Sequence, residues 1–192
     1  MNKKELEIPL RLRKIDALLK RLHETFPKYS IISEEYGRRM AGYLGEKSLK
    51  YYLSLLKDKN YLIFHNLRLP DTSGEHFFEI DLLLISPKFL LTIDAKNYRG
   101  ELHFDGKFDQ FIQTVGDKKK SYSCPIAQTN RHKMQLRKLL ESAKFPSIQI
   151  ENLVVFTNPS AIITATPDHK QVHKVIKSTS FLSKIDLIEK KI

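Results

Sequence analysis

The sequence predicts an α/β protein in which a central mixed β-sheet is flanked by helices. Two observations predict this class. Amphipathic segments with helical spacing lie on both sides of the middle of the chain, and short leucine-rich or β-branched runs bounded by turn residues fill that middle. The 192 residues fit one domain, residues 1–192, which is long enough to bury a sizeable core.

The first third of the chain is predicted to form two helices. Apolar side chains recur at helical spacing between Pro9 and Pro27, which suit a helix start and stop, so we expect a helix over about 9–27. A second helix is expected from Ser33, as its N-cap, to about Leu56. Within it, Glu46 lies one turn before a stripe of leucines, so an acid should point inward.

The middle of the chain is predicted to form a strand over about 61–67 and then a hairpin over 79–96. If the hairpin turns at Pro87 and Lys88, Asp81 lies opposite Asp94, with the two side chains roughly 5 Å apart. Alternation along the strand brings Lys96 to the same face as Asp94. Two carboxylates so close are costly unless a proton or a cation bridges them, and a hard divalent metal is the simplest bridge. An ion pair between Lys96 and either aspartate, with no metal, is the alternative.

The rest of the chain is predicted to continue the sheet and add two helices. Strands over 101–104 and 107–114 should turn at Asp105 and Gly106, followed by an exposed loop over 116–123. A helix should begin at Pro125 and end near residue 143. We expect short strands over 152–157 and 172–176, and Ser180 as the cap of a C-terminal helix.

The charge is unevenly distributed and indicates a polyanionic partner. The net charge is +11, with 14 basic and 8 acidic residues in 1–60, 14 and 6 in 116–192, but 5 and 8 in 61–115. Basic flanks attract a polyanion, whereas the acidic middle repels phosphate unless it binds a metal. This favours nucleic acid over the alternative that the lysines only increase solubility.

The composition also argues against several classes of protein. No apolar run approaches the length of a membrane span, and the N-terminus does not resemble a secretory signal, so we expect no membrane association. The single cysteine, Cys124, excludes an internal disulfide framework and a multi-cysteine zinc site. These features fit a reducing cytoplasm.

The order of the acidic and basic residues resembles a known family. A helix glutamate, a strand aspartate and then acid-x-lysine on the next strand resemble the PD-(D/E)xK nuclease superfamily, which has a restriction-endonuclease-like core. More narrowly, five segments over about 42–157 look like the nuclease-related domain, NERD: Gly45-Glu46, 64–70, 79–85, 94–100 and 125–128. Asp94 stands where the family usually has glutamate, and Cys124 where it usually has asparagine. The helix over 9–27 and the C-terminal strand and helix are additions to this core.

The resemblance implies a Mg²⁺- or Mn²⁺-dependent nuclease that hydrolyses phosphodiester bonds, with DNA as the expected substrate. Asp81, Asp94, the carbonyl of Ala95 and Glu46 would hold the metal. Lys96 would orient or help deprotonate the attacking water, or stabilise the transition state.

Further residues are implied in binding. Gln128 would position water or phosphate, and five cations would contact phosphates: Lys118, Lys119, Lys120, Arg131 and Lys133. Two alternatives stay open. One is an inactive nucleic-acid-binding module on a nuclease-like fold, and the other is a protein-interaction module whose basic helices recognise an acidic partner.

Overall fold

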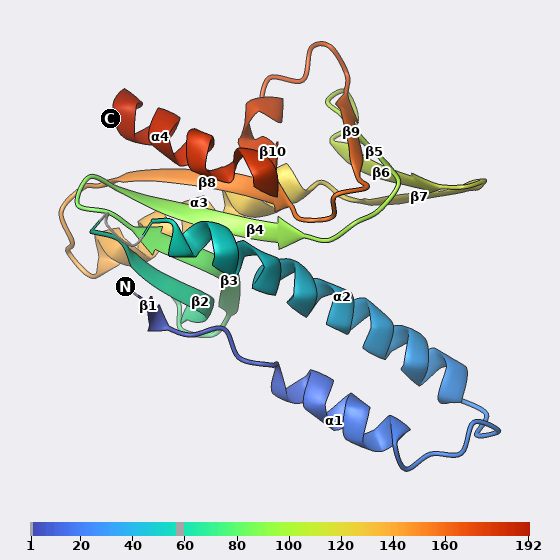
Figure 1. Ribbon diagram of the computed structural model, residues 1–192. Helices are drawn as coiled ribbons and strands as arrows, with labels where there is room; N and C mark the ends of the chain where they lie inside the picture. Colours follow the sequence, from blue (N-terminus) through green and yellow to red (C-terminus); the bar gives the residue numbers. More distant parts are fainter. Residues whose placement is uncertain (1, 57–59) are drawn as a thin grey trace.

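The computed structural model describes residues 2–56 and 60–192, which form two mixed β-sheets flanked by helices (Figure 1). The larger sheet has the order β1 (Asn2–Lys4), β2 (Leu62–Pro70), β3 (Phe77–Ile85), β4 (Phe89–Lys96), β8 (Gln149–Phe156) and β10 (Val175–Lys177). The smaller sheet has the order β7 (Lys118–Ser123), β6 (Gln110–Val115), β5 (Glu101–Asp105) and β9 (Ile162–Ala165). The predicted α/β class with a central mixed sheet is confirmed, and the second sheet is an addition to it.

Helices cover the larger sheet on both sides. Leucines of α2 (Tyr29–Ser54) and apolar residues of α4 (Phe181–Lys191) share one buried cluster with β4, whereas α3 (Pro125–Ser142) packs through Leu136 into another cluster with β3 and β8. Because both faces are covered, β3, β4 and β8 are almost continuously apolar. A third cluster joins the smaller sheet to the ends of β8 and α3.

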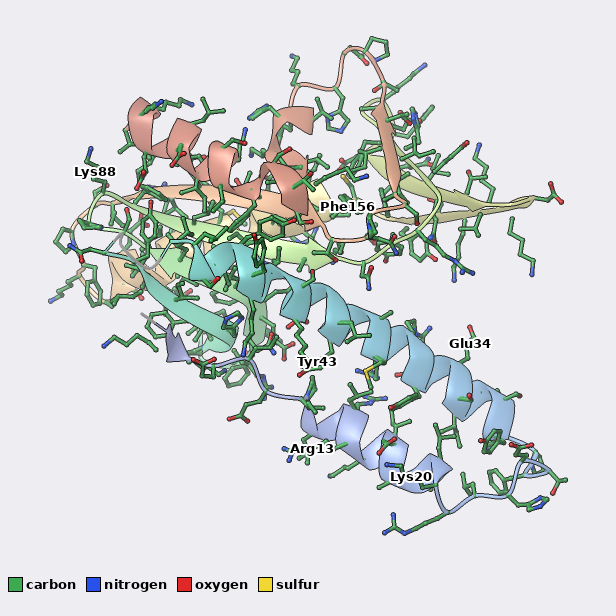
Figure 2. All side chains as sticks on the ribbon, in the orientation of Figure 1. Arg13, Lys20, Glu34, Tyr43, Lys88 and Phe156 are labelled. Carbon is green, nitrogen blue, oxygen red and sulfur yellow. The ribbon has the colours of Figure 1, made fainter. Side chains whose placement is uncertain are left out.

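The predicted hairpin is confirmed, including its register. The N–H of Ser86 donates to the carbonyl of Phe89 at 2.9 Å across the two-residue turn. Pairing runs from Ile85 opposite Leu90 to Leu82 opposite Ile93, so Asp81 and Asp94 occupy the next position beyond the last paired residues. Figure 2 shows Lys88 at the turn, which is the opposite end of β4 from the acidic residues.

Two helix predictions were wrong at their ends. The helix predicted over 9–27 is α1 (Leu10–Leu19), and its buried residue is Leu12, because α1 lies beside α2 and does not pack on the sheet. The apolar side chains of Leu18 and Phe26 are 44% and 43% exposed. The second helix begins at Tyr29, four residues before the predicted cap Ser33, and no side chain caps it.

Several strand predictions also need correction. The loop predicted over 116–123 contains β7, whose lysines pair with β6 in an exposed edge strand that polar composition alone does not reveal. The strand predicted over 172–176 is a 3₁₀ turn (Val172–Lys174) followed by β10. The short strands β1 and β9 were not predicted. Ser180 does precede α4, but its side chain makes no capping hydrogen bond.

None of the helices within the described residues combines the length and apolar composition that a membrane crossing requires.

A close approach between α2 and the end of β4 positions Glu46. A Cβ placed on Gly45 would lie 2.8 Å from Asn97 Cβ and 2.9 Å from Thr157 Oγ1, so only glycine fits. Asn97 Nδ2 also donates to the Ala41 carbonyl at 2.8 Å, which fastens the same turn of α2 to the residue just after β4. The helix therefore meets the strand where the strand carries its polar residues.

We predict that Gly45→Ala lowers the free energy of unfolding by about 1–3 kcal/mol, because the methyl group forces α2 away from β4. Gly42→Ala is the matched control, since a Cβ at Gly42 meets nothing within 4 Å, and alanine in a helix interior gains about 0.5–1 kcal/mol. Urea unfolding measures both. Equal stability of the two variants would contradict the close approach.

Candidate functional site

Two aspartates from neighbouring strands form the centre of the candidate site. Asp94 on β4 is 2% exposed, and Asp81 on β3 is partly buried. The backbone N–H of Ala95 donates to Asp81 Oδ2 at 2.9 Å, which holds the carboxylate of one strand against the backbone of the other. The chain thus places two acids side by side on the two central strands of the larger sheet, just beyond the last paired residues of the hairpin.

Lys96 and Gln128 complete a polar row beside these acids. Lys96 Nζ lies 2.9 Å from Asp94 Oδ2 and donates to Gln128 Oε1 at 3.3 Å. Gln128 stands in the first turn of α3, so this helix orients the lysine from across the site. The ion pair that the sequence left as an alternative is present, between Lys96 and Asp94.

Glu46 reaches the same site from α2. Its carboxyl group interacts electrostatically with Asp81, Asp94 and Lys96, and the side chain of Asn66 lies close enough to lower its pKa. Its Oε2 atom is buried and has no hydrogen-bond partner among the described residues. The structure therefore brings the five predicted catalytic residues into one neighbourhood: Glu46, Asp81, Asp94, Lys96 and Gln128.

Burial and the excess of acidic over basic side chains shift the pKa values of the residues at the site. Burial and then the charge of Asp81 raise the pKa of Glu46 to about 8. Burial and the charge of Asp81 also raise the pKa of Asp94 to about 7, against the opposing effect of Lys96. For Lys96, burial acts to lower the pKa, but the charges of Asp94 and Asp81 together outweigh it, so the net shift is upward and the side chain stays an ammonium.

The donor set suits a hard divalent cation. Asp94 Oδ2 has the Lys96 ammonium nearby but no donor in hydrogen-bond geometry, and Glu46 Oε2 has none either. Within residues 2–56 and 60–192, no group of three or more acidic, histidine or cysteine side chains is placed so that it could hold a metal ion. Mg²⁺ does not require such a group, because it is commonly held by one or two carboxylates and keeps several waters.

The five predicted phosphate-binding cations lie on two elements and do not converge on the acids. Lys118, Lys119 and Lys120 are exposed on β7. Lys120 Nζ lies 5.1 Å from the centre of the Tyr122 ring, and the Tyr122 and Tyr98 rings are 5.3 Å apart between centroids. Tyr98 in turn interacts electrostatically with Lys96, so these two rings connect β7 to the site.

The other two cations lie on α3 on either side of His132. Arg131 is exposed, and its charge acts to lower the pKa of His132. Lys133 lies close enough to Lys174 for its charge to lower the pKa of that lysine.

Sequence reasoning missed two residues near the site. His132 lies one helical turn after Gln128 and near Asp81; burial lowers its pKa, and the charge of Asp81 opposes that shift. The four-residue spacing from Gln128 was a usable signal. Asn66 falls between the paired residues His65 and Leu67 with φ of 47°, directly across from Asp81. No sequence pattern distinguishes that strained position from an ordinary strand residue.

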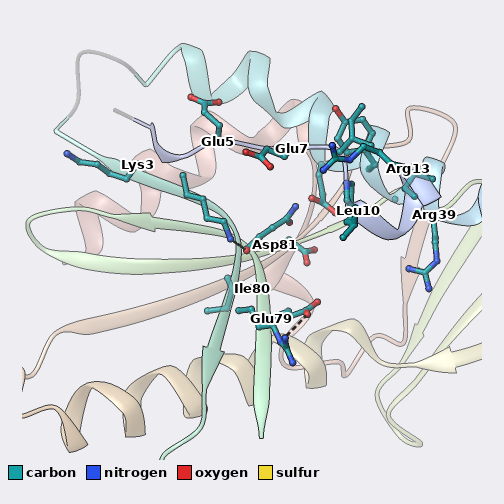
Figure 3. A pocket seen from close by; sticks show the side chains of 18 residues that line it. Lys3, Glu5, Glu7, Leu10, Arg13, Arg39, Glu79, Ile80 and Asp81 are labelled. Atoms are coloured by element: carbon teal, nitrogen blue, oxygen red, sulfur yellow. Dashed lines mark hydrogen bonds and ion pairs between the residues drawn. The ribbon is translucent and has the colours of Figure 1, made fainter. Parts of the chain in front are cut away.

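A cleft opens from Glu46 and Asp81 toward the N-terminal segment (Figure 3). Its volume is about 780 Å³, and Glu46 and Asp81 both line it. One wall comes from residues 3–13, another from α2, and the third from β2 and β3. The acids are therefore accessible from a cleft whose outer wall is the N-terminal segment.

The fold and the site together define the class of protein. A mixed sheet between helices, with acids on a hairpin, a lysine two residues after the second acid and a glutamate on a preceding helix, is a restriction-endonuclease-like core. The chain belongs to the NERD family, because the family model of the nuclease-related domain matches residues 41–157.

Comparison with individual proteins adds one relative. An uncharacterized protein of Bacillus anthracis is 30% identical over 100 residues, which are 52% of this chain. The chain spans about half of that relative, since the match covers 47% of its length. No solved structure matches the chain significantly.

The raised carboxyl pKa values predict how stability depends on pH. Folded Glu46 and Asp94 retain protons that the unfolded chain releases near pH 4, so their contribution to stability is present at low pH and is lost as pH rises through about 7 and 8. In EDTA, the melting temperature of the wild type should fall between pH 5 and pH 8 more than that of Glu46→Gln or Asp94→Asn. Parallel curves for all three proteins would show that these carboxyl groups titrate normally.

Proposed function

We propose that this protein is a divalent-metal-dependent nuclease that hydrolyses phosphodiester bonds, with DNA as its substrate. The observation that carries the proposal is the meeting of Asp81, Asp94 and Lys96 beside Glu46 and Gln128. Membership of the NERD family and the basic flanks of the chain support it.

Asp81, Asp94 and the carbonyl of Ala95 would hold Mg²⁺ or Mn²⁺, with Glu46 beside them. A bound ion of this kind neutralises the scissile phosphate and lowers the pKa of a water molecule. The three acidic side chains oppose a single lysine, so a site with all of them ionised has a deficit of positive charge. This deficit favours the binding of a cation at the end of the β3–β4 hairpin.

Lys96 would act as a fixed positive charge. Because its pKa is raised, it is a poor general base, so of the three roles open from the sequence we favour orientation of the attacking water and stabilisation of charge in the transition state. Asp94 and Gln128 hold the ammonium between them, which restricts where it can donate. Gln128 is a positioning residue for Lys96 in this arrangement.

The test is cleavage of plasmid and linear DNA with Mg²⁺, Mn²⁺ or EDTA. We expect cutting that depends on the metal and falls by about a hundredfold or more in Asp81→Ala and Lys96→Ala. Lys138→Ala on the exposed face of α3 should cut at the wild-type rate. Tight DNA binding without cutting in every metal would instead favour an inactive binding module, and absence of DNA binding would favour a protein-interaction module.

The aspartate at position 94 offers a second test of the same proposal. Asp94→Glu introduces the residue that the family usually carries, and it adds one methylene between the strand and the carboxylate. Because the wild-type carboxylate already contacts Lys96 at 2.9 Å, we expect Asp94→Glu to retain activity within about tenfold, while Asp94→Asn loses about a hundredfold or more. Steady-state cleavage rates measure both. Full activity of Asp94→Asn would show that the Asp94 carboxylate is not needed for cleavage.

A further inference from the structure

The cleft beside the acids has the dimensions of a site for a small ligand or a short piece of chain. A volume of about 780 Å³ falls in the usual range of about 300–1,000 Å³ for such sites. Such a volume does not enclose a double helix, whose two backbones and stacked base pairs are much bulkier than the ligands that sites of this size hold. A single polynucleotide strand does, because it can enter as a narrow chain with its bases unstacked.

The cleft wall combines positive and aromatic side chains. Arg13 from α1 and Arg39 from α2 line one side, with Asp81 at the centre (Figure 3). Tyr43 also lines the cleft, on the side of α2 that faces α1, and Arg13 lies across from it (Figure 2). Cations that follow a backbone and an aromatic ring on which a base stacks are the features of single-strand sites.

The charges differ in how free they are to contact a phosphate. Arg39 is bound to Glu35 through its Nε at 2.5 Å, whereas the Arg13 side chain makes no ion pair or hydrogen bond with any of the described residues. On the rim, Arg68 and Glu79 are 3.9 Å apart and largely neutralise each other. Glu7 is an acid of the N-terminal wall, and it opposes a phosphate. Among the three arginines that line the cleft, Arg13 is therefore the strongest candidate for a phosphate contact.

We propose that this cleft binds a single DNA strand and leads it to Asp81 and Glu46, with Arg13 contacting a phosphate and Tyr43 stacking on a base. This rests on the proposed nuclease function and names its substrate as single-stranded. The N-terminal wall, residues 3–13, lies outside the region that matches the family. The substrate preference would therefore come from a segment that this chain adds to the common core.

Gly42 allows the cleft to be blocked without disturbing the fold. It lines the cleft from α2, and a Cβ built on it meets nothing within 4 Å. Gly37 is the matched control, because it lies on the same helix, has equally open surroundings and does not line the cleft. Gly42→Trp and Gly37→Trp thus add the same side chain to the same helix inside and outside the cleft, and melting temperatures check that both fold.

The experiment measures binding by fluorescence polarisation with a labelled DNA oligonucleotide, as a single strand and as a duplex, with EDTA and with Ca²⁺. We expect the wild type to prefer the single strand and Gly42→Trp to bind it about tenfold or more weakly, as the loss of one stacked base would cause. Gly37→Trp should bind like the wild type. Equal binding by Gly42→Trp, a preference for the duplex, or binding of single-stranded RNA but not DNA would each overturn the proposal.

The salt dependence tests the phosphate contact separately. Arg13→Gln should reduce the slope of log affinity against log salt by about 0.7, the value for one phosphate contact on a single strand. Lys14→Gln removes the same charge from the next residue of α1, outside the cleft, and should leave the slope unchanged. Glu7→Gln should strengthen binding. Equal slopes for Arg13→Gln and Lys14→Gln would show that Arg13 does not contact a phosphate of the bound strand.

Cleavage assays on the same variants separate the two proposals. If the wild type cuts DNA and Gly42→Trp cuts a single strand equally well, the cleft proposal fails and the nuclease proposal stands. If the wild type binds the single strand through the cleft but cuts nothing with Mg²⁺ or Mn²⁺, the nuclease proposal fails and the cleft proposal stands.

Discussion

The placement of a buried aspartate, Asp94, beside a partly buried one, Asp81, on the central strands of an apolar sheet is the constraint on which the site depends. Asp94 is almost fully enclosed, and its nearest charges are the carboxylate of Asp81 and the ammonium of Lys96. An enclosed carboxylate is stable only with a proton or a cation close by. Lys96 supplies one positive charge to three acidic groups, and the pKa values of Glu46 and Asp94 are raised first by burial and then by the charge of Asp81.

The surrounding fold holds this unfavourable group of charges in place. The tight turn at one end of the hairpin sets the register that puts Asp81 level with Asp94 at the other end. Gly45 lets α2 come close enough to deliver Glu46, and the first turn of α3 delivers Gln128 to Lys96. Three separate elements therefore converge on β4, and stability is given up at the site for an arrangement that a proton or a cation would compensate.

The hairpin and its charged residues could be predicted from the sequence because they follow from local rules. Strand alternation and the turn at Pro87 determine which side chains are neighbours, and no distant contact is needed. The helix ends, β7 and the cleft could not be predicted in this way. The limits of α1 depend on its packing beside α2, the pairing of β7 depends on β6, and the contribution of Arg13 to the cleft depends on a segment that lies far from Asp81 in sequence.

The central claim is that these carboxylates bind a divalent cation, and calorimetric titration of the protein with Mn²⁺ near pH 7 tests it most directly. Binding should release protons, because at this pH Glu46 is largely protonated and Asp94 is partly protonated in the free protein. The measured heat should therefore change with the ionisation enthalpy of the buffer, and the double variant Asp81→Asn, Asp94→Asn should not bind. Absence of binding by the wild type, or equal binding by the double variant, would contradict the account.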